Sequence, residues 1–366
     1  MSVTYRRILV IGLIGVAVGA FLAGRLLAEN DWNPTTTIKF GEVFAEQNAY
    51  AEDLLGPIVV APSAGHDGKF FFSQAMDPFY IEPETHAVYL DRPTYRAQRM
   101  LYPTIASLGG LLGPTATAWG LIVVNLVAMG VGTAVTARLA MEMGLSPWYG
   151  LAFLLNPGLI VEIHIDSAGL VATAALMAAV LAAMWNRPWA TGGFMAAAVL
   201  ARETMLLAAV GLAVYFVWQK KKAPLALALP FMAVGGWWAY VHWRLADGLA
   251  QDTQAIGLPL VGFIEAFQDW VSTPDRMVDL LIALVLLFAS VAVAVRAVIR
   301  PSALGLAIAP FAILALVMSE PVWARYFDSA RTLAPVLTGY ALLVPAAIKA
   351  DRASRSTQTA VRALSS

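Results

Sequence analysis

Long apolar runs separated by short polar breaks fill most of this chain. Runs near the ~20 residues that a helix needs to cross a bilayer fall at 8–27, 117–140, 148–163, 168–186, 189–201, 203–218, 223–243, 279–299, 302–318 and 332–348. The pattern predicts an all-α polytopic membrane protein with about ten transmembrane helices. The runs at 148–163, 189–201 and 203–218 are short for a crossing and predict tilted helices, or helices whose ends the protein surrounds.

The predicted topology depends on whether the apolar run at 100–113 crosses the membrane, since Pro103, Gly109 and Gly110 interrupt it. If it does not cross, the basic clusters fall on one side, as the positive-inside rule favours. That side then holds thirteen bases against Glu142 and Asp351; the bases are Arg6, Arg7, Arg138, Arg187, Lys220, Lys221, Lys222, Arg296, Arg300, Lys349, Arg352, Arg355 and Arg362. We therefore expect both termini in the cytoplasm. Arg6-Arg7 before an apolar run also resembles a secretory signal, but Arg25 interrupts the cleavage pattern and favours an uncleaved anchor.

Composition agrees with a membrane protein. Hydrophobic residues make up 59% of the 366 positions and charged residues 13%, which excludes a water-soluble globule. The formal net charge is zero, so no nucleic-acid partner is indicated. Cysteine is absent, which excludes disulfides, thiolate metal sites and a cysteine nucleophile.

Three polar segments are predicted on the outer face, at 28–116, 244–278 and 319–331. Phe40, Val43, Phe44 and Gln47 have helical spacing and predict a surface helix in the first segment; Phe263, Phe267 and Trp270 predict another in the second. The tail at 351–366 is polar and is expected to be disordered.

Asp67 lies in the first outer segment, in the sequence GHDGKFFF. Asp-Gly is a common turn signal, so a solvated turn carboxylate is the simple interpretation. Phe70, Phe71 and Phe72 would hold this turn at the depth of the lipid headgroups, where partial burial adjusts a carboxyl pKa. A carboxylate there is a candidate base.

Glu162, His164 and Asp166 alternate at the outer end between two apolar runs. An extended segment aligns all three and predicts a divalent metal site, whereas a helix aligns only Glu162 with Asp166. The simpler interpretation is that they cap helix ends, with Asp166 as an N-cap residue. We expect no metal.

Two further polar groups fall at the outer boundary. Arg202 and Glu203 must lie near the surface, pair with each other or face a cavity, because a charge in the bilayer is costly. Arg325 and Arg331 flank aromatic residues, and guanidinium groups suit phosphate; ordinary interfacial anchoring is the alternative.

These motifs resemble the GT-C superfamily of membrane glycosyltransferases, with a bacterial mannosyltransferase-like character. The resemblance rests on GHDG, YRAQRMLYP (95–103), the Asn156-Pro157 helix with His164-x-Asp166, ARET (201–204) and RYFDSARTLAP (325–335). It implies an N-terminal GT-C-like domain at 1–222, which includes the outer segment 28–116, and further transmembrane helices at 223–350.

The resemblance also implies a function and a set of site residues. A sugar is expected to move from a polyprenyl-phosphate carrier to a hydroxyl of a glycan, lipid or protein acceptor, at the extracytoplasmic face of a bacterial plasma membrane. Asp67 would be the general base, and Arg325, Arg331 and Arg202 would bind the donor phosphate in the same cavity. The supporting residues would be His66, Asp77, Arg96, Arg99, Glu162, His164, Asp166, Glu203 and Asp328.

Other functions remain open at this point. Several families of the superfamily carry two adjacent acids in the first loop, whereas Gly68 follows Asp67 here. A transporter or lipid flippase would place ionisable residues near the bilayer midplane, often on broken helices. A noncatalytic scaffold with the same fold is a third possibility.

Overall fold

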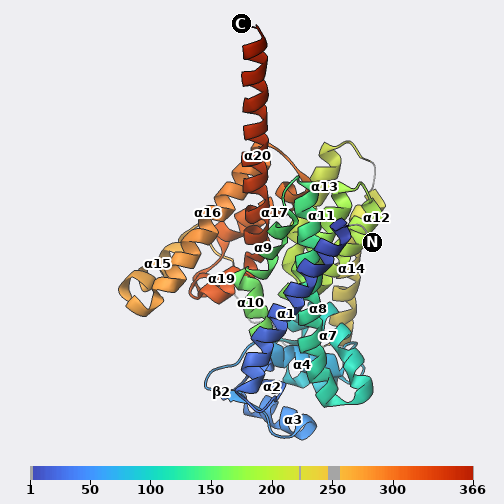
Figure 1. The fold of residues 1–366 in the computed structure, drawn as a ribbon. Helices are drawn as coiled ribbons and strands as arrows, with labels where there is room; N and C mark the ends of the chain where they lie inside the picture. Colours follow the sequence, from blue (N-terminus) through green and yellow to red (C-terminus); the bar gives the residue numbers. More distant parts are fainter. Residues whose placement is uncertain (1–2, 222–223, 246–255, 366) are drawn as a thin grey trace.

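The computed structural model describes residues 3–221, 224–245 and 256–365. Within these ranges the chain is almost wholly helical (Figure 1). The two named strands, β1 (Phe40–Gly41) and β2 (Val60–Ala61), form one short parallel pair. The predicted all-α membrane class is confirmed, while Lys222 and part of the predicted 244–278 segment lie outside the described residues.

The prediction of ten spans is wrong for the part of the chain that the structure describes. Four helical segments are long and apolar enough to cross a membrane, or five if a pair bent by 64° is one span. They are α1 (Val3–Ala28), α8 (Pro114–Glu142), α14 (Pro224–Arg244), η5 (Pro274–Arg276) with α16 (Met277–Ile299), and the bent pair α19 (Tyr326–Thr332) with α20 (Ala334–Ser365).

The other apolar helices are too short for a full crossing. At 1.5 Å per residue, a helix of about 15 residues covers roughly 22 Å of a ~30 Å hydrocarbon layer. They are α7 (Leu101–Ala106) with η2 (Ser107–Leu112), α11 (Gly169–Met184), α12 (Pro188–Ala201), η4 (Glu203–Met205) with α13 (Leu206–Trp218), and α17 (Ala303–Val317). The 100–113 run therefore does not count as a span.

The apolar run at 148–163 is broken into three pieces. They are η3 (Pro147–Gly150), α9 (Leu151–Leu154) and α10 (Pro157–His164). Asn156 makes the break: its side chain accepts a hydrogen bond from Gly158 N at 3.0 Å and donates to Ala334 O at 2.8 Å. The start of α10 is thereby fixed to the start of α20.

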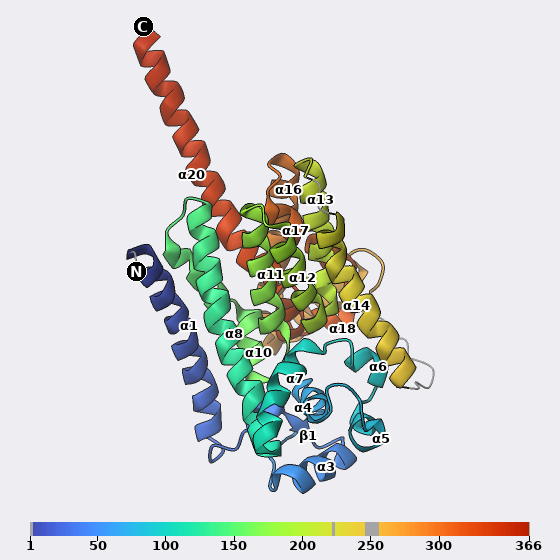
Figure 2. The same ribbon diagram turned by 90° about the vertical axis from the view of Figure 1, so that its right-hand side faces the viewer.

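Both termini lie at the end of the helical body opposite the segment between α1 and α8 (Figure 2). Basic side chains join the helices at this end: Arg300 pairs with Asp351 at 2.7 Å, and Lys349 donates a hydrogen bond to Gly144 O. The tail expected to be disordered instead continues α20 to Ser365. A helix already begun in the packed body extends easily into such residues, because each added residue needs no new nucleus.

The segment between α1 and α8 forms a small module at the other end (Figure 2). Its helices are α2 (Thr35–Ile38), α3 (Ala45–Leu55), α4 (Gly68–Met76), α5 (Pro83–His86), η1 (Ala87–Tyr89) and α6 (Pro93–Arg96). The predicted surface helix starts later than expected, at Ala45, because Phe40 pairs in β1. Phe70, Phe71 and Phe72 do not face lipid as expected; they are at most 4% exposed and pack inside the module.

Of the other two predicted outer segments, 244–278 contains α15 (Val261–Ser272), and 319–331 contains α18 (Glu320–Trp323) and most of α19. The helix predicted around Phe263 and Trp270 is confirmed. Trp270 and Trp323 are fully buried, and Phe263 contacts both rings edge to face.

Candidate functional site

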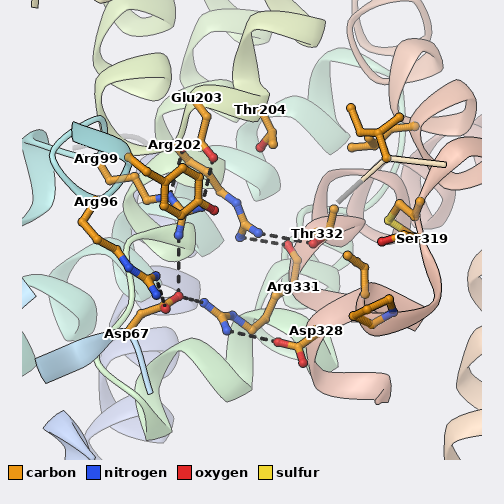
Figure 3. A pocket seen from close by; sticks show the side chains of 16 residues that line it. Asp67, Arg96, Arg99, Arg202, Glu203, Thr204, Ser319, Asp328, Arg331 and Thr332 are labelled. Atoms are coloured by element: carbon orange, nitrogen blue, oxygen red, sulfur yellow. Dashed lines mark hydrogen bonds and ion pairs between the residues drawn. The ribbon is translucent and has the colours of Figure 1, made fainter. Parts of the chain in front are cut away.

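Five distant parts of the chain bring charged side chains to one cavity beside the module (Figure 3). Asp67 precedes α4, Arg99 follows α6, Glu203 begins η4, and Arg331 lies on α19. The fifth part is α10, whose Glu162 is fully buried behind the cavity and bonds Arg331.

Asp67 is held by three guanidinium groups. Its Oδ1 accepts from Arg96 Nη1 at 2.9 Å, and its Oδ2 accepts from Arg331 Nη2 at 3.0 Å, with Arg99 Nη1 at 3.6 Å. Arg96 and Arg331 approach the carboxylate from opposite sides (Figure 3). Two predicted site residues that are 264 positions apart, Asp67 and Arg331, are thus in direct contact.

The glycines of GHDG explain why Asp67 is placed here. Gly65 has φ +71°, a left-handed conformation that favours glycine, and a Cβ there would lie under 3.0 Å from Lys39 O. A Cβ on Gly68 would lie 2.6 Å from Ile38 O and 2.8 Å from Ile165 O. The turn therefore packs backbone to backbone between the end of α2 and the end of α10.

Glu162 connects the two deepest arginines. Its Oε1 accepts from Arg331 Nε at 2.8 Å and lies 3.4 Å from Arg202 Nη1, while its Oε2 accepts from Gly169 N at 2.7 Å. A Cβ on Gly169 would overlap the Glu162 carboxylate. The carboxylate is thus a fixed internal counter-ion for two guanidinium groups.

Arg202 and Glu203 face the cavity but do not pair with each other. Glu203 accepts two hydrogen bonds from Arg99, from Nε at 3.0 Å and Nη2 at 2.9 Å. Arg202 has only long contacts, at 3.3 Å to Arg331 O and to Thr332 Oγ1, and its Nε has no partner among the described residues.

The cavity is about 530 Å³ in volume and has a charged half and an apolar half. Asp67, the four arginines and Glu203 line one half. Apolar side chains from the end of α17 and the following turn line the other; they include Leu314, Met318, Pro321 and Val322. Such a lining fits a ligand with an anionic group next to an apolar one.

The arginines keep Asp67 ionised. Burial alone would raise the pKa of its carboxyl group, but Arg331, Arg99 and Arg96 outweigh burial and hold that pKa well below its usual range. His66 packs its ring edge to face on Phe327 at 5.7 Å. Burial, together with the charge of Arg331, lowers the pKa of His66, so this imidazole is neutral at neutral pH.

Several predicted site residues lie outside the cavity. Arg325 is exposed next to the Phe327 ring. Asp77 accepts from the backbone N–H groups of Ile81 and Glu82 and stabilises that turn. His164 lies at the end of α10, whereas Asp328 lines the cavity 3.6 Å from Arg331 Nη1.

Asp166 is not the expected N-cap, because α11 begins at Gly169 with Ala168 as its cap. It is 1% exposed and has φ +43°, and the side chains of Thr37 and Asn125 together with the charge of Lys39 offset only part of the effect of its burial. Burial raises its pKa to about 7. Glu162 and His164 end a helix rather than forming the extended metal-binding arrangement; in the described part of the chain no three His, Cys, Asp or Glu side chains are grouped to hold a metal ion.

Three side chains that contact the arginines of the site were not predicted from the sequence. The Tyr95 hydroxyl accepts a hydrogen bond from Arg99 Nη2 at 3.0 Å, and Ser167 Oγ accepts from Arg331 Nη2 at 2.8 Å. Asp91 binds Arg96 through both carboxylate oxygens, at 2.8 and 3.0 Å. The spacing of Asp91 and Arg96 around a helix start was the available signal.

Comparison of the chain with protein-family models, curated proteins and solved structures finds no match.

Proposed function

We propose that this protein is a membrane glycosyltransferase. It moves a sugar from a polyprenyl-phosphate carrier to an acceptor hydroxyl at the extracytoplasmic face of a bacterial plasma membrane. One observation carries the proposal: a carboxylate and several arginines share a 530 Å³ cavity with an apolar wall. A lipid-linked sugar phosphate has the same division between an anionic group and a hydrocarbon chain.

Arg202 is the guanidinium best placed to take the donor phosphate. Its protein contacts are long and its buried Nε has no partner in the described part of the chain, so a phosphate oxygen would supply a bond that these residues leave unmade. Arg331 would be the second phosphate ligand. Guanidinium groups bind phosphate oxygens in pairs and stabilise the charge that develops on a departing phosphate.

Donor binding also activates Asp67. In the free protein its pKa is far below neutrality, and such a carboxylate is a weak base. A phosphate dianion or monoanion competes with Asp67 for Arg331 and Arg99. The carboxylate loses part of its positive surroundings, and its pKa rises toward the range in which it accepts a proton.

The chemical step then balances within the site. The acceptor oxygen attacks the anomeric carbon and gives its proton to a carboxylate oxygen of Asp67. The bond between the anomeric carbon and the phosphate oxygen breaks, and its electrons leave with the polyprenyl phosphate. Arg202 and Arg331 stabilise this leaving group.

The test is transfer of radiolabelled sugar from polyprenyl-phosphate donors by purified protein in liposomes. Asp67→Asn should lower turnover by about 100- to 10,000-fold, since a positioned base contributes that much. Asp53→Asn is the matched control, because Asp53 is an exposed acid on α3. Full turnover in Asp67→Asn excludes the base role, and movement of the donor across the bilayer without transfer identifies a flippase instead.

A further inference from the structure

A second cavity lies in the module beside the candidate active site. It has a volume of about 410 Å³ and shares no lining residue with the cavity of Asp67. It lies between the start of α3 and the turn that follows η1. Its lining residues are Val43, Phe44, Ala45, Glu46, Gln47, Val88, Tyr89, Leu90 and Asp91.

One guanidinium group joins the two cavities. Arg96 donates to Asp91 through Nε at 2.8 Å and Nη2 at 3.0 Å, and through Nη1 to Asp67 at 2.9 Å. Asp91 lines the second cavity and Asp67 lines the first. A single guanidinium group therefore bridges one carboxylate from the lining of each cavity.

The lining of the second cavity offers mainly hydrogen-bond acceptors. Glu46 and Asp91 are carboxylates, and Gln47 is 8% exposed with an Oε1 that has no donor among the described residues. The Gln47 amide cannot be turned over, because its Nε2 donates to Tyr89 O and a flip would set two oxygens against each other. Such a lining favours a ligand with several hydrogen-bond donors.

The charge around the cavity argues against a cationic ligand. Arg96 already neutralises Asp91, and Arg92 Nε lies 4.0 Å from the same carboxylate. The buried Lys69 ammonium lies 3.4 Å from the centre of the Phe44 ring, so a third cation is close. A neutral ligand with several hydroxyl groups fits this balance better than an amine.

Two aromatic rings complete the cavity. Phe44 is held by Lys69, and Tyr89 is stacked on Tyr50 with ring centres 4.1 Å apart. Fixed aromatic rings offer flat apolar surfaces at a small entropic cost. The C–H face of a sugar ring matches such a surface while its hydroxyl groups point to the rim.

We propose that this second cavity binds a neutral sugar ring of the acceptor, with its hydroxyl groups donating to Glu46, Asp91 and Gln47. This assignment rests on the proposed transferase function and specifies its acceptor as a glycan. This ring would then lie across Arg96 from the donor, while the reacting hydroxyl of the acceptor reaches Asp67 in the first cavity.

Binding is tested without turnover by saturation-transfer NMR on the full-length protein in detergent. Methyl glycosides of common hexoses and pentoses serve as probes. At least one should receive saturation from wild type, and Phe44→Leu and Glu46→Gln should each weaken its binding about tenfold, as expected for one lost contact to a charged or stacked group. Glu52→Gln, an exposed acid on the same helix, is the matched control, and thermal unfolding checks that each variant is folded.

The transfer assay separates this proposal from the transferase function. In Glu46→Gln the KM for a glycan acceptor should rise about tenfold. No saturation of any glycoside by wild type, or unchanged binding and acceptor KM in both variants, overturns the second cavity as a sugar site. Glycoside binding that depends on Phe44 and Glu46, without turnover from any donor, supports the cavity and overturns the transferase.

Discussion

Arg202 shows how a buried side chain can be charged, enclosed and still incompletely bonded. It is 8% exposed, yet its contacts to Glu162, Arg331 O and Thr332 are all 3.3 Å or longer. Proteins usually satisfy such groups fully, because an unmade bond to a buried charge is costly. The incomplete bonding is therefore the residue-scale observation on which the proposed phosphate contact of Arg202 rests.

Arg202→Lys tests this interpretation while keeping the charge next to Glu162. We expect sugar transfer to fall about 10- to 100-fold, because an ammonium group cannot bind a phosphate through a planar pair of N–H groups. The measurement is kcat and donor KM in liposomes, with Arg187→Lys, at an exposed position, as control. Equal kinetics of the two variants would remove Arg202 from phosphate binding.

Asp166 gives a prediction about stability and pH. Its pKa is about 7 in the folded protein against 3.8 ordinarily, so the folded state keeps a proton that the unfolded state loses between these values. The free energy of unfolding should therefore fall as pH rises from about 4 to 7 and then level off. At pH 8 Asp166→Asn should be more stable than wild type by up to about 4 kcal/mol.

Thermal unfolding of both proteins from pH 4 to 8 measures this difference. The two should differ least near pH 4, where the wild-type carboxyl is protonated in the folded state and about half ionised in the unfolded state, and separate as the pH increases. Asp53→Asn, at an exposed acid, should follow wild type throughout. A gap that stays constant with pH would mean that Asp166 remains ionised in the folded protein.

At the residue scale, the sequence predicted several charged residues of the cavity but did not predict their ion-pair partners. Asp67, Arg202, Glu203 and Arg331 were all singled out, and all line one cavity. Their partners were not predictable, because Glu203 binds Arg99, 104 positions away. Such pairing depends on how helices pack, which local patterns do not encode.

At the scale of elements, the turn at Gly65 depends on both conformation and space. Gly65 and Gly56 both have positive φ, +71° and +75°, but only Gly65 is crowded; nothing lies within 4 Å of a Cβ on Gly56. With ψ −150°, Gly56 lies in a backbone region that only glycine enters readily, so Gly56→Ala should cost about 1–3 kcal/mol of stability. Gly65→Ala should cost more and displace Asp67, so transfer should fall as well.

The measurements are the unfolding midpoint and the transfer rate of each variant. Gly56→Ala reports backbone strain alone, whereas Gly65→Ala reports strain together with displacement of Asp67. If both variants lose the same stability and keep full transfer, the packing of Gly65 against Lys39 O does not position Asp67.

Element types were predictable where periodicity is strong and length is clear. The spacing of Phe263, Phe267 and Trp270 predicted a helix, and the structure gives it the bounds Val261–Ser272. Apolar runs overstated the number of spans, because hydropathy reports burial without saying whether lipid or protein surrounds a helix. Within α11, for example, Leu170, Leu176 and Met177 are fully buried by other helices.

At the scale of the whole molecule, charge divides the two ends. Arg138, Lys349 and Arg300 make their contacts at the end that carries both termini, while Asp67 belongs to the module at the other end. From the positive-inside rule we predict that the module lies outside the cell. This orientation is required by the proposed function, since the donor and acceptor are expected there.

The absence of cysteine makes this orientation directly measurable. Single cysteines at Glu52, exposed on α3, and at Gln219, exposed after α13, report the two ends of the molecule. A membrane-impermeant maleimide applied to intact cells should label Glu52→Cys and should reach Gln219→Cys only after the membrane is opened. The reverse pattern would place the cavity of Asp67 on the cytoplasmic side, where a nucleotide sugar could serve as donor and the case for a polyprenyl-phosphate carrier would fail.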